Sequence, residues 1–247
     1  MARKPALSLV STSSGEMVDG LSRSSVVYEL LRQDLLHGVF TPGEKLTVVA
    51  LCNRYAMGAS SVREALNRLS SERLVERIDQ RGFRVASLDW TELPILLQTR
   101  CQVETWALRE SIQRRTPAWE DRLVLLVHRL SKTPRSLATD TYVINPAWEE
   151  LHSQFHQTLI ANCASRWLRQ FCASLADDAY RFRQVAASKN YAVRDEAEHI
   201  GIFKACIGGN EDDAVVLLEA HYRHTAALTQ VAVGTGGSWL TKPFPSI

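Results

Sequence analysis

Histidines carry most of the chemistry that this sequence offers. His152 and His156 are four residues apart, so in a helix both imidazole rings lie on one face and can bind the same ion. His199 and His221 each lie in a segment of helical periodicity with apolar neighbours. Taken singly, each is better explained as a buried histidine that bonds a carbonyl group, but rings directed inward from three helices can meet.

The segments that must position these histidines are predicted to be helical. From Trp90 onward, apolar residues recur with the 3.6-residue period and without the alternation of strands. Six helices are expected, near 90–114, 118–132, 145–161, 166–188, 193–208 and 211–231. We therefore predict an all-helical domain over 89–232, followed by an irregular tail over 233–247 that is rich in glycine and proline.

The N-terminal part of the chain has a different organisation. Residues 1–22 are expected to form a flexible tail, because a short apolar stretch gives way to serines and a glycine. Three helices should follow: one over 24–37, a second that begins after Thr47, and a third that Ser60 or Ser61 caps. Two β-like runs, 74–78 and 83–88, then flank a hairpin tip at 79–82. This order is that of a winged helix-turn-helix over 23–88, so the whole fold is predicted to be mainly α.

The third of these helices has one apolar and one polar face. Its apolar residues recur at i, i+3, i+4 and i+7: Val62, Ala65, Leu66 and Leu69. Its polar face carries Ser60, Ser61, Arg63, Glu64, Asn67 and Arg68. Arginine and asparagine can bond the edges of guanine and adenine, and hydroxyls can bond phosphates. A merely solvated face would explain this helix alone, but not the short helix before it, the tight turn between them and the basic hairpin after it.

This region resembles the DNA-binding domain of the GntR superfamily, in its FadR-type branch. The resemblance covers roughly residues 24–88 and is carried by GVFTPGEKL at 38–46, SVREAL at 61–66, LVER at 74–77 and RG at 81–82. It implies that Arg63 reads bases in the major groove of double-stranded DNA. It also implies that Arg81 and Gly82, at the tip of the wing, enter the minor groove.

The chain departs from the family pattern at two positions of this domain. FadR-type members often carry one arginine early in the second helix and another at the turn before the third, where this chain has Val49 and Ala59. The operator sequence of the family therefore does not transfer to this chain. Arg54 and Arg68 are expected to take up part of the missing contact with DNA.

Residues 92–230 resemble the FCD ligand-binding domain of the same regulators, which is an antiparallel helical bundle. The resemblance is carried by the segments 155–156, 198–202, 208–209 and 214–221. In that domain an aspartate and three histidines commonly hold a divalent metal. The histidines match His156, His199 and His221, whereas His152 occupies the position of the aspartate. The polar pair of the opening helix matches Arg100 and Glu104, and the register of Arg100 with apolar neighbours directs it inward, toward an effector.

Histidine in place of aspartate affects which ion and which effector suit the site. Four neutral imidazoles favour Zn²⁺, Ni²⁺ or Cu²⁺ over Mg²⁺ or Ca²⁺, so we expect zinc, with nickel as the alternative. Without a carboxylate ligand the ion keeps its full charge, and together with Arg100 it would attract an anion. We therefore expect a small carboxylate effector, specifically a dicarboxylate. Segments 82–87, 148–156, 162–165 and 180–182 resemble a carbon-starvation regulator of this group, which implies the same effector class.

Together these interpretations predict a ligand-responsive DNA-binding regulator, a repressor of a catabolic operon. One recognition helix makes too few contacts for a specific operator, so a homodimer on palindromic DNA is expected. Two alternatives stay open: a metal-dependent enzyme, and a regulator that senses the metal itself. An enzyme is disfavoured because the sequence has no HExxH motif, and Glu198 is the only nearby candidate for a general base. Scattered cysteines without a CxxC pair, and no apolar run of about 20 residues, predict a cytoplasmic protein that does not contact a membrane.

Overall fold

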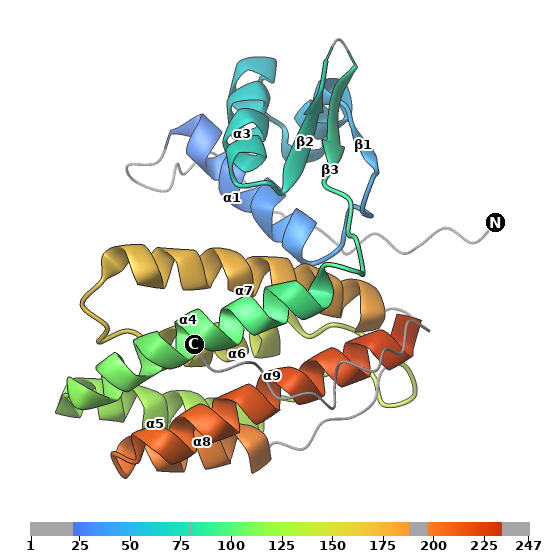
Figure 1. Ribbon diagram of the computed structural model, residues 1–247. Helices are drawn as coiled ribbons and strands as arrows, with labels where there is room; N and C mark the ends of the chain where they lie inside the picture. The colour runs from blue at the N-terminus through green and yellow to red at the C-terminus, as the bar shows by residue number, and fades with distance from the viewer. Residues whose placement is uncertain (1–21, 80, 188–196, 234–247) are drawn as a thin grey trace. The chain divides into compact units, whose positions relative to one another are not determined.

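The computed structural model describes residues 22–79, 81–187 and 197–233 of the chain. Contacts divide the chain into two units, one with residues up to 32 and 45–84, the other with 33–44 and the residues from 85 onward (Figure 1). The two predicted tails, 1–22 and 233–247, lie outside the described residues except for Ser22 and Val233. No helix in the described ranges combines the length and the apolar character that crossing a membrane requires.

The first unit has the element order of a winged helix-turn-helix. Its helices and strands are α1 (Arg23–Leu36, the end of which belongs to the second unit), β1 (Lys45–Leu46), α2 (Val48–Tyr55), α3 (Ala59–Ser71), β2 (Val75–Ile78) and β3 (Gly82–Val85). The strands form a sheet in the order β1-β3-β2, in which Leu46 of β1 pairs antiparallel with Phe83 of β3. The predicted hairpin is thus confirmed, although β3 ends three residues early, and β1 was not predicted.

Local interactions at the start of α2 and α3 set the geometry of the helix-turn-helix. Thr47 caps α2 as predicted, because its hydroxyl accepts a hydrogen bond of 3.3 Å from the backbone N–H of Ala50. The predicted serine cap of α3 is wrong. The helix begins at Ala59, two residues before the start that a Ser60 cap would give, and its N-cap is the extended Gly58, which has no side chain to bond the helix. Ser60 and Ser61 therefore lie in the first turn of α3.

The apolar stripe of α3 is buried completely, as predicted: Val62, Ala65, Leu66 and Leu69 are all 0% exposed. Across from it, α1 contributes Tyr28, whose hydroxyl donates a hydrogen bond of 2.7 Å to Glu72 just after α3. The guanidinium of Arg68 lies over the same ring, 3.8 Å from its centre. These contacts hold α3 against α1 and leave the opposite face of α3 exposed.

The second unit contains the six predicted helices, and the mainly α fold is confirmed. They are α4 (Leu93–Gln113), α5 (Pro117–Lys132), α6 (Pro146–Leu159), α7 (Arg166–Ala187), α8 (Ala197–Ile207) and α9 (Glu211–Val233). Helix α4 packs against α7 and α9 and runs antiparallel to both (Figure 1). Residues 188 and 193–196, which were predicted as helix, lie outside the described residues.

Helix α6 carries two of the histidines, and hydrogen bonds hold both of its ends. Asn145 is its N-cap: the side-chain oxygen accepts from the N–H of Ala147, and the side-chain amide donates to the carbonyl of Pro134 at 2.6 Å. Pro146 occupies the first helical position, where the missing N–H costs nothing. At the other end, the indole of Trp119 on α5 donates to the carbonyl of Thr158 at 2.6 Å. Both ends of α6 are therefore anchored to other segments.

Candidate metal centre and DNA-binding surface

The fold brings the four predicted histidines together from three helices. His152 and His156 come from α6, His199 from α8 and His221 from α9, and one potential ligand atom of each lies within 4.8 Å of the others. The Nε2 atoms of His152 and His156 are 3.2 Å apart. His199 and His221 are buried and the other two are half-buried. We call these four residues the His cluster.

Aromatic rings hold the imidazoles in place. The indole of Trp148 stacks on His152, with 4.7 Å between ring centres and 17° between planes. Phe155, which is completely buried, makes edge contacts with both His156 and His199. The apolar surroundings restrict the rings and also remove water from them.

This environment keeps the α6 histidines neutral. Burial is the main cause that lowers the pKa of His152 and His156 well below its ordinary value, and the positive forms of the neighbouring imidazoles would add repulsion. A neutral imidazole has a nitrogen lone pair that can bind a metal, so both rings have the protonation state that a metal ligand needs.

Glu198 bonds the outer side of the cluster. Its Oε2 lies 2.8 Å from Nδ1 of His221, and its other oxygen bonds Nδ1 of His224. When Nδ1–H of His221 donates to this carboxylate, Nε2 is left as the atom with the lone pair. A carboxylate that orients a metal-binding histidine in this way is common around metal sites. The sequence had suggested Glu198 only as a candidate general base.

The donor set fits a tetrahedral transition-metal ion. Nitrogen ligands at the usual zinc distance of about 2.0 to 2.1 Å have tetrahedral edges of about 3.3 Å. The 3.2 Å separation of the His152 and His156 nitrogens already has this length. Four neutral nitrogen donors suit Zn²⁺, Ni²⁺ and Cu²⁺. The residues present therefore fit the predicted class of ion.

Arg100 is buried, as predicted, and its main partner is Glu104 on the same helix. The Nε of Arg100 donates to Glu104 Oε1 at 2.6 Å, and the guanidinium lies over the ring of Tyr222, 4.2 Å from its centre. The Tyr222 hydroxyl donates to Glu104 and lies 3.3 Å from Nδ1 of His156. Burial raises the pKa of Tyr222 well above its ordinary value, as does Glu104, so the phenol remains a donor. This ion pair borders the His156 side of the cluster.

A second buried ion pair was not predicted. Arg183 of α7 donates through Nη2 to Oε2 of Glu149, whose side chain is 3% exposed. Glu149 precedes His152 by three residues on α6 and therefore shares its side of the helix. The three-residue spacing from His152 could have identified Glu149 from the sequence. Its partner on α7 could not be identified in this way, because that contact depends on how the helices pack.

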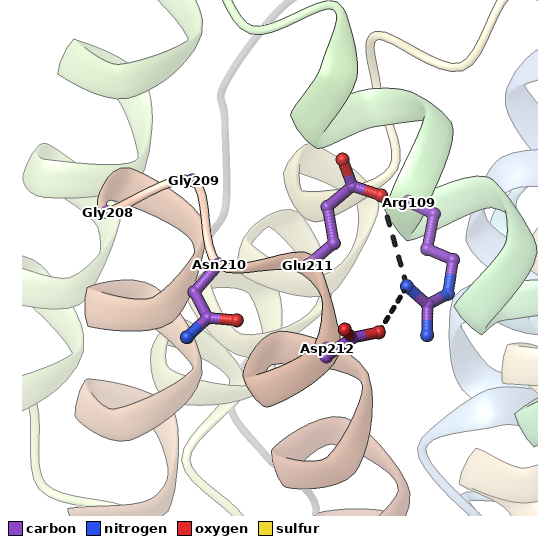
Figure 2. A pocket seen from close by; sticks show the side chains of 6 residues that line it. All are labelled: Arg109, Gly208, Gly209, Asn210, Glu211 and Asp212. Carbon is purple, nitrogen blue, oxygen red and sulfur yellow. Dashed lines mark ion pairs between the residues drawn. The ribbon is translucent and has the colours of Figure 1, made fainter.

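A separate pocket lies at the turn between α8 and α9 and is open to solvent (Figure 2). It is lined by Arg109 and by residues 208–212. Arg109 pairs there with Asp212 at 2.7 Å, and Glu211 lies 3.9 Å away, so the charges of the lining largely satisfy one another. None of the lining residues belongs to the His cluster, and we assign no effector to this pocket.

The residues predicted to contact DNA lie on three elements of the first unit. Arg63 and Asn67 are exposed one turn apart on α3, with Ser60 and Arg68 also exposed and Ser61 half-buried. Arg54 is exposed at the end of α2. Arg81 and Gly82 are exposed in the β2–β3 hairpin, where Gly82 has the positive φ of 91° that its position in the tip suggested. The apolar stripe of α3 faces inward, so the polar residues of α3 lie on its solvent-facing side.

Comparison with known proteins gives two family matches that together span most of the chain. Residues 23–85 match the family described as "Bacterial regulatory proteins, gntR family". Residues 95–224 match the FCD domain. The two matches correspond to the winged helix-turn-helix and to the helical bundle.

Individual relatives agree with these matches. The uncharacterized HTH-type transcriptional regulator BphR of Paraburkholderia xenovorans (strain LB400) is 29% identical over 204 residues, which are 82% of this chain and 83% of BphR. The HTH-type transcriptional repressor GlaR of Escherichia coli (strain K12) is 36% identical over 156 residues, 63% of this chain and 70% of GlaR. Among solved structures, E. coli McbR/YncC has a similar fold, with a TM-score of 0.69 at 17% identity over 86% of this chain and 99% of McbR/YncC.

A winged helix-turn-helix joined to a helical bundle with a histidine cluster defines a DNA-binding transcriptional regulator. The chain belongs to the GntR family of bacterial regulatory proteins and carries an FCD domain. It is a regulator and not an enzyme, and the enzyme alternative finds no support among its relatives.

Proposed function

We propose that this regulator is a repressor of a catabolic operon, and that it senses a small dicarboxylate in a metal-containing pocket of its FCD domain. The observation that carries the proposal is the convergence of four imidazole nitrogens from α6, α8 and α9 within 4.8 Å. The name of GlaR, a repressor, supports the sign of regulation. Because its target is chromosomal DNA, we place the protein in the cytoplasm.

The first unit binds the operator through α3 and the hairpin. Arg63 and Asn67 read base edges in the major groove, Ser60 and Ser61 bond phosphates, and Arg81 and Gly82 enter the minor groove. Arg54 and Arg68 add phosphate contacts, for which the stacking of Arg68 on Tyr28 orients its guanidinium. Two copies of the unit in a homodimer bind the two halves of a palindromic site.

The His cluster holds zinc, or nickel as the alternative, through His152, His156, His199 and His221. The bound ion supplies positive charge in a partly dehydrated site, which attracts a carboxylate. The buried Arg100–Glu104 pair borders the same site and contributes to effector binding. Effector binding then shifts the population of dimer arrangements toward one that fits the operator less well.

A gel-shift titration with the DNA upstream of the protein's own gene tests this function. The zinc-loaded protein should bind this DNA, and succinate or glutarate should release it. Neutral sugars and amines should have no effect at equal concentration. Release by those neutral compounds instead of organic acids would contradict the effector class.

The same titration distinguishes the proposed dicarboxylate sensor from the alternative, a regulator that senses the metal itself. In the proposed function, the metal-loaded protein responds to the dicarboxylate at constant zinc. In the alternative, adding or chelating zinc changes DNA affinity and dicarboxylates have no effect at any zinc concentration.

A further inference from the structure

Two ion pairs flank the His cluster, one buried (Arg100–Glu104) and one in which Glu149 is buried and Arg183 is half-buried. The two guanidinium groups differ in which of their N–H groups lack an acceptor. Arg100 bonds Glu104 through Nε at 2.6 Å and through Nη2 at 3.3 Å, and Tyr222 covers its plane. Arg183 bonds Glu149 through Nη2 alone. Its Nη1 is buried and has no hydrogen-bond partner among the residues that the structure describes. A buried donor without an acceptor is unfavourable, and a bound ligand could supply that acceptor.

Arg183 lies on the His152 side of the cluster. Its partner Glu149 is one turn before His152, and Trp148, the neighbour of Glu149, stacks on the His152 ring. On the other side, the ring of Tyr222 lies against Arg100, and its hydroxyl is 3.3 Å from Nδ1 of His156. The two pairs therefore border the cluster on different sides.

In the proposed function one carboxylate of the effector binds the metal. We propose that Nη1 of Arg183 binds the other carboxylate. This inference rests on the proposed function, in which the effector is a dicarboxylate. A guanidinium bonds a carboxylate with one of the stronger hydrogen bonds in proteins, and Glu149 keeps this guanidinium in place before the ligand arrives. A monocarboxylate of equal length would leave Nη1 unsatisfied, so Arg183 selects for the second carboxylate.

Isothermal titration of the zinc-loaded full chain tests this assignment. The probes are two pairs of equal length, succinate against butyrate and glutarate against pentanoate. The variant E149Q/R183Q removes the guanidinium without leaving a buried charge unpaired. We expect it to lose about tenfold or more of its affinity for the dicarboxylate that binds best, while monocarboxylate affinity changes by less than about threefold.

The matched variant R100Q/E104Q removes the other buried pair. Whatever it does to overall affinity, it should keep the wild-type ratio between dicarboxylate and monocarboxylate binding. If this variant loses the ratio and E149Q/R183Q keeps it, Arg100 is the anchor and the assignment to Arg183 is overturned.

Two further measurements separate the remaining outcomes. R183K keeps a cation beside Glu149 but has no Nη1, so it should lose the same selectivity even if the double variant does not fold. Zinc content and thermal melting report whether each variant is folded. A wild-type protein that binds no dicarboxylate would refute the proposed function, whereas binding with equal selectivity in all variants would overturn the role of Arg183 alone.

Discussion

At position 152 a single residue changes the charge of the His cluster. An aspartate there would bring a negative charge into direct contact with the ion, whereas His152 brings a neutral nitrogen. The carboxylate nearest to the cluster is then in the outer shell, where Glu198 bonds His221. An ion bound by the four histidines would therefore keep its positive charge, with the compensating negative charge of Glu198 behind His221.

Replacing Glu198 tests how much this arrangement contributes to metal binding. Without the carboxylate, the ring of His221 loses its orientation and its preferred tautomer. We expect Glu198→Ala to lower zinc affinity about 10- to 100-fold, measured by competition with a chromophoric chelator. Glu219→Ala is the matched control, because Glu219 lies on the same helix as His221 but pairs with Arg223, and both side chains are half-buried. Equal losses in both variants would show that the effect is not specific to Glu198.

Arg63 is the residue on which sequence-specific DNA binding should depend most. It is exposed on α3 and has the geometry to bond one base bidentately. We expect Arg63→Ala to weaken operator binding by about 1 to 3 kcal/mol and to leave binding to unrelated DNA nearly unchanged, measured by fluorescence anisotropy. Arg129→Ala, an exposed position on α5, serves as the control for a simple loss of charge. A variant that binds the operator as tightly as the wild type would contradict the role of Arg63.

At the scale of helices and strands, the sequence predicts best where a short local motif decides the outcome. Thr47 caps α2 as predicted, whereas the caps Thr116 and Asn145 were not predicted, although each has a side chain suited to capping and directly precedes a helix. Prediction failed where a competing local feature was stronger: α3 starts after the extended Gly58, so Ser60 and Ser61 do not act as caps. The two residues of β1 are too few to show alternation, and their pairing with β3 depends on tertiary structure.

In the candidate site, too, contacts that depend on tertiary structure could not be predicted from the sequence. The four histidines could be placed on inward helix faces from periodicity, and the family resemblance grouped them as a set. The Glu149–Arg183 pair and the contact of Glu198 with His221 connect different helices, and nothing in local spacing specifies which helices become neighbours. Sequence reasoning therefore grouped the four histidines that the structure brings together, but not the ion pair and the carboxylate around them.

The N-cap of α6 should couple helix stability to metal affinity. Asn145→Ala removes the cap and leaves the Pro134 carbonyl without its donor, so we expect a loss of about 1 to 3 kcal/mol in unfolding free energy, measured in urea. Zinc affinity should fall as well, because the cap positions the helix that carries His152 and His156. Thr116→Ala removes the cap of α5, which carries none of the His cluster, and should cost about 1 kcal/mol without changing zinc affinity. Unchanged zinc affinity in Asn145→Ala would show that the cap does not position the histidines.

For the whole molecule, the two units meet different physical demands. The first presents an exposed polar face to DNA and keeps its core small, with α3 held by its apolar stripe and by Tyr28. The second encloses polar and ionisable groups in a helical core, including Arg100, Glu104 and Glu149, at a cost that pairing offsets. Neutral imidazoles in contact with one another add no favourable charge interaction to that core, so a bound ion should contribute much of the stability of the second unit.

Thermal unfolding with and without zinc measures that contribution. A ligand that binds only the folded state stabilises it by about 2.7 kcal/mol at a concentration one hundred times its dissociation constant. The ligands all come from α6, α8 and α9, so calorimetry should show that a chelator lowers the transition of the second unit and leaves that of the first in place. In His156→Ala, the difference between the melting curves with zinc and with chelator should be smaller than in the wild type, because three of the four ligands remain. A chelator that shifts both transitions equally would show that the units unfold together, and the metal would then stabilise the DNA-binding unit through that coupling.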